Sequence, residues 1–196
     1  MAPPGIEYSF MEAFLISTLS VAIAEIGDKT QLLSLVLAAR YRKATPIIMG
    51  ILIATLVNHG LSVLLGAWLA DLVPADTLRW IIGVSFIVLG LWLLIPDKAD
   101  DDEAQFKGMG AFTATLLLFF LAEIGDKTQV ATVVLAGKYA SGLLVTMGTT
   151  IGMLAANVPV VLMGKKAMAA MPLKTIHLVA CGLFVLIGIG TIAFSG

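Results

Sequence analysis

The chain has 196 residues, of which 59% are hydrophobic and only 13% are charged, and its formal net charge at pH 7 is −1. Its mean hydropathy of +1.01 is far from that of soluble globular domains, in which roughly a quarter of the residues are charged. The charge pattern contains no basic stripe, which argues against a nucleic-acid partner. The composition therefore predicts a membrane protein with little room for a separate catalytic domain.

Six apolar segments run along the chain, and each approaches or exceeds the about 20 residues that a membrane-spanning helix needs. They cover residues 10–38, 46–70, 78–95, 110–136, 142–163 and 175–194. The first basic residue is Lys29, so the N-terminus lacks the basic region of a secretory signal peptide and the first segment is expected to be retained. Cys181 is the single cysteine and cannot form an intramolecular disulfide.

One string of eight residues, A-E-I-G-D-K-T-Q, occurs at residues 24–31 and again at residues 122–129, an offset of 98 residues. Three apolar segments precede the acidic stretch at residues 97–103 and three follow it, so each half carries one copy of the motif. We therefore expect a first three-helix repeat at residues 1–96, an acidic cytoplasmic linker at residues 97–108, and a second three-helix repeat at residues 109–196.

The odd number of spans in each half requires the two halves to enter the bilayer from opposite sides. Many secondary transporters have this inverted-repeat plan, with the binding site at the repeat interface near the membrane midplane. The expected fold is thus an all-α membrane protein with six transmembrane helices in two inverted three-helix repeats. Arg40-Tyr41 and Lys138-Tyr139 share the offset of the motif, which extends the duplication beyond the motif itself.

The basic residues predict the orientation, because cytoplasmic loops carry the excess of Lys and Arg. If the N-terminus is outside, the cytoplasmic loops hold Arg40, Arg42, Lys43, Lys98, Lys107, Lys165, Lys166 and Lys174, and the opposite side holds Arg79 and Lys138. Both termini are therefore expected outside. The acidic linker is interpreted as a solvated, self-repelling spacer, and a cytoplasmic metal sensor is the less favoured interpretation.

Each motif places a Glu, an Asp and a Lys near the middle of an apolar segment, where one charge costs roughly 2.5 to 3.5 kcal/mol on insertion scales. On a continuous helix these three side chains would project from one face, although the glycine before the aspartate would also allow the helix to unwind. Pseudo-twofold symmetry would bring both motifs to a shared centre. The predicted metal ligands are Glu25, Asp28, Glu123 and Asp126.

The chemistry of these groups favours a hard divalent cation. Carboxylate and amide oxygens suit calcium, manganese or magnesium, and magnesium gives up its waters reluctantly, so calcium or manganese fits an all-protein site better. His59 is either an additional ligand or, as is more usual for a single histidine within a helix, simply hydrogen-bonded. The predicted supporting residues are Lys29, Thr30, Gln31, Lys127, Thr128, Gln129, Asn58 and Asn157.

The two motif lysines have two alternative roles. Lys29 and Lys127 could pair with Glu25 and Glu123, four residues earlier on a helix, or they could leave the site toward an interface when metal binds. Without metal, four crowded carboxylates at low dielectric cannot all stay ionised. Metal entry must then displace protons, as an antiporter requires. No resident cofactor is expected, because Mn²⁺ or Ca²⁺ is the cargo and H⁺ is the counter-ion.

These motifs resemble a known family, the calcium/manganese to proton exchangers, which is defined by two copies of E-x-G-D-[KR]-[TS] and includes bacterial manganese exporters and Golgi manganese/calcium exchangers. Both copies match in full, and the resemblance extends over nearly the whole chain. It implies that the four motif acids carry the cation. It also implies a bacterial inner-membrane protein that exports the cation against an inward flow of protons. Manganese is ranked ahead of calcium from the apparent bacterial origin, not from any residue.

Other functions compete with this interpretation. An intramembrane aspartyl protease would use a G-x-G-D motif and two acids that share a proton, which gives no reason for a lysine in each motif, so the chain is not expected to be an enzyme. Buried ion pairs that merely set helix register are weak stabilisers. A cation channel lined by acidic residues and an exporter of a small organic cation or amino acid remain alternatives. The expected partners are the divalent metal ion and the lipid bilayer, and the oligomeric state is left open.

Overall fold

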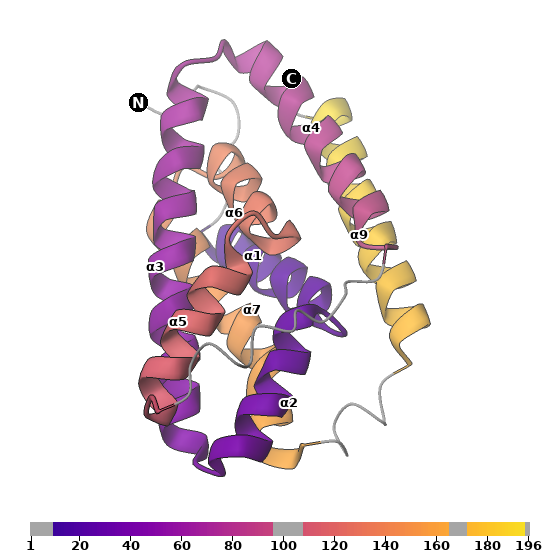
Figure 1. Cartoon of the computed structure of the whole chain (residues 1–196). Coiled ribbons are helices and arrows are strands. Elements are labelled where there is room, and N and C mark those ends of the chain that lie inside the picture. The colour runs from indigo at the N-terminus through magenta and orange to yellow at the C-terminus, as the bar shows by residue number, and fades with distance from the viewer. Residues whose placement is uncertain (1–9, 96–107, 165–171, 195–196) are drawn as a thin grey trace.

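The computed structural model describes residues 10–95, 108–164 and 172–194, so most of the predicted linker lies outside the described residues. Within these ranges the chain is all-helical, with eight helices and no strand (Figure 1). The helices are α1 (Phe10–Glu25), α2 (Lys29–Tyr41), α3 (Ala44–Asp71), α4 (Ala75–Trp92), α5 (Ala111–Glu123), α6 (Lys127–Lys138), α7 (Gly142–Met163) and α9 (Leu173–Phe194).

Four helices, α3, α4, α7 and α9, are each long and apolar enough to cross a membrane. Helices α1 and α2 pass the same test together and are bent by 70° at the break between them, which makes a fifth candidate span. Helices α5 and α6 have 13 and 12 residues, and each alone is too short for a hydrocarbon core of about 30 Å at 1.5 Å per residue. The described residues thus form a multi-pass membrane protein with four to five candidate spans.

The structure corrects the expectation of a continuous helix through each motif. Helix α1 ends at Glu25 and α2 begins at Lys29, while α5 ends at Glu123 and α6 begins at Lys127. At the two breaks Gly27 and Gly125 have φ angles of 85° and 76°, a backbone region that glycine enters without the steric cost of a side chain. The prediction that Glu, Asp and Lys share one helical face is therefore wrong, and the alternative, unwinding at the glycine, is what occurs.

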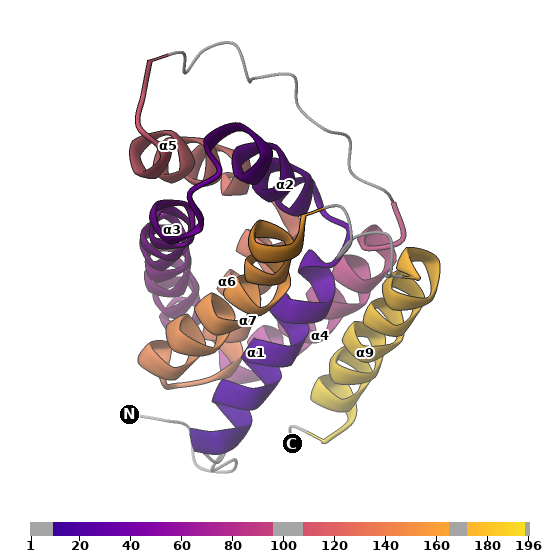
Figure 2. The ribbon, with the colours of Figure 1, turned by 90° about the horizontal axis from the view of Figure 1, so that it is seen from below.

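The core is built from helices that pack across the two halves of the sequence. Helix α1 packs along α7, and α5 packs along α3 (Figure 2). A Cβ atom at Gly148 would lie 2.6 Å from the carbonyl oxygen of Phe14, and one at Gly50 would lie 3.0 Å from the carbonyl oxygen of Phe112. Glycine is needed at both positions because the backbones approach so closely. Gly148 lies 98 residues after Gly50, and Phe112 lies 98 residues after Phe14, so the two contacts occupy equivalent positions in the two halves.

Helices α4 and α9 pack against each other at one side of this core (Figures 1 and 2). A Cβ atom at Gly188 would lie 2.6 Å from the carbonyl oxygen of Gly83, and one at Gly90 would lie 3.0 Å from that of Cys181. Between these contacts the rings of two phenylalanines, also 98 residues apart, meet edge to face with centroids 5.8 Å apart; they are Phe86 and Phe184. The two helices therefore form a tightly interlocked pair.

Candidate cation site

Both motifs form the same turn at the break between their two helices. The backbone N–H of Asp28 donates to the carbonyl of Glu25 at 3.1 Å, and that of Asp126 donates to the carbonyl of Glu123 at 3.2 Å. The two aspartates are the N-cap residues of α2 and α6 and have extended backbone angles. Each break therefore sets a glutamate at the end of one helix and an aspartate at the start of the next, where the helix dipole favours negative charge.

The threonine and glutamine of each motif hold this turn. The side-chain oxygen of Gln31 accepts a hydrogen bond from the N–H of Gly27 at 2.9 Å, and Thr30 donates its hydroxyl to Glu25 Oε2 at 2.6 Å. Such bonds matter within a membrane because a helix break leaves backbone donors that no water can satisfy. The second motif repeats both bonds, with distances of 2.6 Å for Gly125 to Gln129 and 3.0 Å for Thr128 to Glu123.

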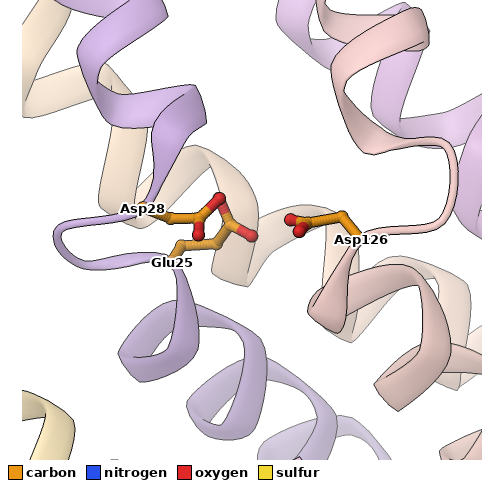
Figure 3. Close-up of side chains that lie close together, drawn as sticks. All are labelled: Glu25, Asp28 and Asp126. Carbon is orange, nitrogen blue, oxygen red and sulfur yellow. The ribbon is translucent and has the colours of Figure 1, made fainter. Parts of the chain in front are cut away.

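Three of the four predicted ligands come together between the two breaks. Figure 3 shows the carboxylates of Glu25, Asp28 and Asp126 turned toward one another, and one oxygen from each lies within 4.8 Å of the other two. All three residues are at most 4% exposed. Three buried carboxylates so close together fit a hard divalent cation, because oxygen donors are the ligands that such a cation takes in proteins.

Glu123, the fourth predicted ligand, lies beside this group of three acids and is not one of its members. It is fully buried and close enough to Glu25, Asp126 and Lys29 for direct charge–charge interactions. Among the described residues, one carboxylate oxygen of each glutamate, Oε1 of Glu25 and Oε1 of Glu123, accepts no hydrogen bond. A buried oxygen of this kind is costly unless something pairs with it, and a cation or a proton at this centre would do so.

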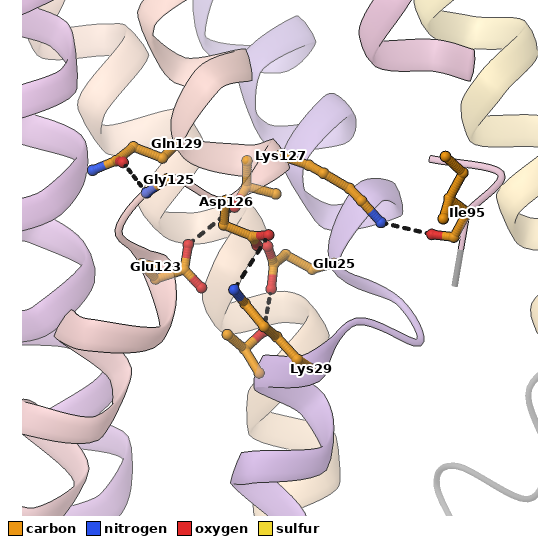
Figure 4. A network of polar contacts seen from close by, with 10 residues as sticks. Glu25, Lys29, Ile95, Glu123, Gly125, Asp126, Lys127 and Gln129 are labelled. Carbon is orange, nitrogen blue, oxygen red and sulfur yellow. Dashed lines mark hydrogen bonds and ion pairs between the residues drawn. The ribbon is translucent and has the colours of Figure 1, made fainter. Parts of the chain in front are cut away.

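The two motif lysines have different contacts although their motifs are identical. Lys29 Nζ lies 3.6 Å from Asp126 Oδ1, which joins the two halves of the chain. Lys127 Nζ donates to the carbonyl oxygen of Ile95 at 2.8 Å, just beyond the end of α4 (Figure 4). Sequence reasoning did not identify the Ile95 carbonyl, because no side-chain signal marks a backbone acceptor.

The predicted asparagines tie the long helices to the motif helices. Asn58 donates to the carbonyl of Phe120 at 3.0 Å, which links α3 to α5 just before Glu123. Asn157 accepts from Ser34 at 2.8 Å, which links α7 to α2. The sequence analysis did not predict Ser34 as a supporting residue. The signal that could have identified it is a serine within an apolar segment, three residues after the motif.

His59 fits neither of its two predicted roles in this conformation. Its side chain is fully buried, and neither ring nitrogen has a hydrogen-bond partner among the described residues. It also lies outside the group formed by Glu25, Asp28 and Asp126. The simply hydrogen-bonded histidine expected as the more usual case is therefore not observed.

The described residues thus form a multi-pass membrane protein in which three buried carboxylates meet beside two helix breaks, a group that could hold a metal ion. The sequence profile of the family described as "Divalent cation/proton antiporter GDT1" matches residues 13–101 and 111–195, and the chain belongs to this family. The resemblance inferred from the two motifs is thus confirmed. The family consists of transporters, so the protease interpretation gains no support.

Known relatives agree with this assignment. The chain is 52% identical to a Vibrio cholerae protein named "Putative manganese exporter" over 185 residues, which are 94% of this chain and 92% of that protein. It is 26% identical to a GDT1-like protein of Synechocystis over 91% of this chain and 96% of the relative. It is 29% identical to GDT1-like protein 3 of Arabidopsis thaliana over 74% of this chain and 58% of the relative. No solved structure matches the chain significantly.

Proposed function

We propose that this divalent cation/proton antiporter exports manganese, with calcium as the second candidate, across a bacterial inner membrane. The observation that supports it best is the buried group of Glu25, Asp28 and Asp126, because it draws acids from both motifs into one site. The donor oxygens suit either ion. The ranking of manganese first is supported by the name of the Vibrio cholerae relative and its 52% identity.

We further propose that the chain forms six spans in two inverted three-helix repeats at residues 1–96 and 109–196, joined by the linker at residues 97–108. The α1–α2 and α5–α6 pairs would each form one broken span. Support comes from the exchange of partners between halves, since α1 packs on α7 as α5 packs on α3. Both termini would then lie outside, as the distribution of Lys and Arg favours.

Metal movement is coupled to proton movement because the cation and the protons compete for the same carboxylate oxygens. Glu25, Asp28, Glu123 and Asp126 hold the cation when ionised, and they hold protons when the cation leaves, since a metal ligand must be deprotonated. The titration belongs to the group of acids and not to a single residue. The threonine and glutamine of each motif, with Asn58 and Asn157, keep the broken helices and their glutamates in place.

The test is metal flux in proteoliposomes that contain the purified protein, under an imposed pH gradient, with Mn²⁺ and Ca²⁺ in parallel and an internal pH dye. We expect metal movement matched by opposite proton movement, and an Asp126→Asn control with neither. Metal flux that ignores the pH gradient would instead indicate a channel. If neither ion moves while proton flux responds to an organic cation or amino acid, the organic-cation exporter would replace the proposal.

A further inference from the structure

The first motif break is covered by the N-terminal end of α9. The ring nitrogen Nε2 of His177 donates to the carbonyl oxygen of Ile26 at 2.9 Å. A Cβ atom at Gly27 would lie 2.9 Å from the side chain of Leu173 and 3.0 Å from Nε2 of His177. Helix α9 therefore closes on the turn that connects two of the cation ligands, Glu25 and Asp28.

The second motif break is open in the same structure. A Cβ atom at Gly125 would meet no described atom within 4 Å beyond its chain neighbours, and Ile124 is 55% exposed. Its counterpart Ile26 is only partly exposed. Two turns with the same sequence and the same backbone geometry thus differ in whether a helix covers them.

The helix that corresponds to α9 in the first half is α4, and their contacts fix the register between them. Phe86 packs on Phe184, and the Gly188 contact with Gly83 is matched by the Gly90 contact with Cys181. Phe184 lies 98 residues after Phe86, Gly188 lies 98 residues after Gly90, and Cys181 lies 98 residues after Gly83. By this register the counterpart of His177 is Arg79, and both side chains carry N–H groups that can donate to a carbonyl.

We propose that His177 and Arg79 are alternating positioning residues for the two motif breaks. The interlocked α4–α9 pair moves as one unit, because its glycine contacts leave no room for one helix to slide on the other. In the conformation described, His177 holds the first break through the Ile26 carbonyl. In the opposite conformation, Arg79 holds the second break through the Ile124 carbonyl, and His177 leaves Ile26.

The proposal rests on the proposed antiport and its topology, and it assigns a sidedness. Helix α9 begins after the loop with Lys165 and Lys166, which the charge distribution places in the cytoplasm. Helix α4 begins after an outer loop. His177 therefore closes the cytoplasmic side of the site and Arg79 closes the outer side, which is the alternation that exchange across a membrane requires.

The experiment measures cross-linking in the full-length protein in proteoliposomes, with Cys181→Ala as the background. One variant carries Ile26→Cys with Leu173→Cys, next to the covered turn, and the other carries Ile124→Cys with Ala75→Cys, the equivalent positions at the 98-residue offset. Both variants keep His177 and Arg79. A short bifunctional thiol reagent is applied with and without Mn²⁺ under each direction of the pH gradient. We expect reciprocal yields: a condition that raises cross-linking of one pair lowers that of the other, and cross-linking of either pair stops metal flux.

A third readout separates a positioning role from a merely structural one. Adding His177→Ala to the Ile124→Cys, Ala75→Cys variant removes the bond that holds the first break and keeps Arg79, so the second pair should cross-link several-fold faster. The control is Leu178→Ala, an exposed neighbour on the same helix, which should leave the rate unchanged. If the pair at positions 75 and 124 never cross-links, or if the two yields rise and fall together, the proposal is overturned. Wild-type metal/proton exchange measured in parallel shows whether the proposed function still stands.

Discussion

Asp126 shows how much one side chain does in this site. Its backbone caps α6, its carboxylate faces Glu25 and Asp28, and it pairs with Lys29 at 3.6 Å. A single aspartate thus joins the two halves and places its carboxylate beside two other buried acids, as expected of a cation ligand. Because an amide of the same shape keeps the cap but removes the charge, isosteric substitution can separate folding from transport.

The first prediction concerns the four acids. Glu25→Gln, Asp28→Asn, Glu123→Gln and Asp126→Asn should each abolish metal-coupled proton movement while the protein stays folded, since the amides keep the size of the side chains and lose the negative charge. The measurement is flux in proteoliposomes, with a thermal unfolding curve as the control for folding. Wild-type flux in any variant would remove that residue from the site.

The second prediction concerns the threonine of the first motif, whose hydroxyl lies 2.6 Å from Glu25 Oε2. Thr30→Val keeps the shape and loses the hydrogen bond, which favours the ionised Glu25 that the metal needs. Mn²⁺ should therefore bind more weakly, by up to roughly tenfold if a bond worth about 1.5 kcal/mol to a charged acceptor is made only in the metal-bound state. Thr30→Ser keeps a hydroxyl and should bind nearly as the wild type does. Mn²⁺ titration by calorimetry compares the two, and equal affinities would show that the bond does not orient the ligand.

At the scale of the element, the helix breaks place the acids. An unbroken helix would project Glu25 and Asp28 from one face, whereas the turn at Gly27 lets Asp28 cap α2 and point its carboxylate toward Asp126. The same turn recurs at Gly125 with nearly the same φ. What surrounds the two glycines differs, because α9 lies on one break and not on the other.

The third prediction follows from this difference. Gly27→Ala and Gly125→Ala should both destabilise the protein by about 1 kcal/mol or more, since φ is positive at both and L-residues are strained there. Gly27→Ala should cost slightly more, because its Cβ would displace the ends of the Leu173 and His177 side chains. The control is Gly182→Ala within α9, which has open space around it. Thermal unfolding in detergent ranks the three, and a loss at Gly182 as large as those at the two motif glycines would contradict the role of positive φ.

At the scale of the whole molecule, antiport needs a site that exchanges its occupants and a scaffold that exposes the site to each side in turn. In the proposed function, competition of metal and protons for the buried acids meets the first need. For the second we propose movement of the α4–α9 pair, which packs against α1 and α6.

The fourth prediction is the pH dependence of binding. Mn²⁺ must displace protons from the buried acids, so its apparent affinity should rise as the pH is raised and binding should release protons. Calorimetry in buffers of different ionisation enthalpy measures the number released. If the Mn²⁺ affinity and the number of protons released both stay constant from acidic to alkaline pH, metal and protons do not compete for the same acids.

The fifth prediction concerns the acidic linker, most of which lies outside the described residues. Neutralising Asp100, Asp101 and Asp102 together with asparagine should leave transport largely intact, since a run of like charge acts as a solvated spacer. Proteoliposome flux measures this directly. A clear loss of flux would instead support the interpretation of the linker as a metal sensor.

The class of protein, the repeated motif and the acids within it could be predicted from the amino-acid sequence. Charged residues in an apolar chain are costly, so a doubled E-x-G-D-K-T motif within apolar segments already indicates a cation site. The glycine in each copy also indicated where a helix could break, because its freedom at positive φ belongs to the residue itself.

Which of these groups contact one another depends on how the helices pack. That Lys29 reaches Asp126 while Lys127 reaches the carbonyl of Ile95 could not be predicted from two identical motifs, and neither could the cover that His177 places over one turn. These contacts join residues up to 151 positions apart. They depend on how whole helices cross and how closely their backbones approach, and that packing is a property of the assembled core and not of any local pattern.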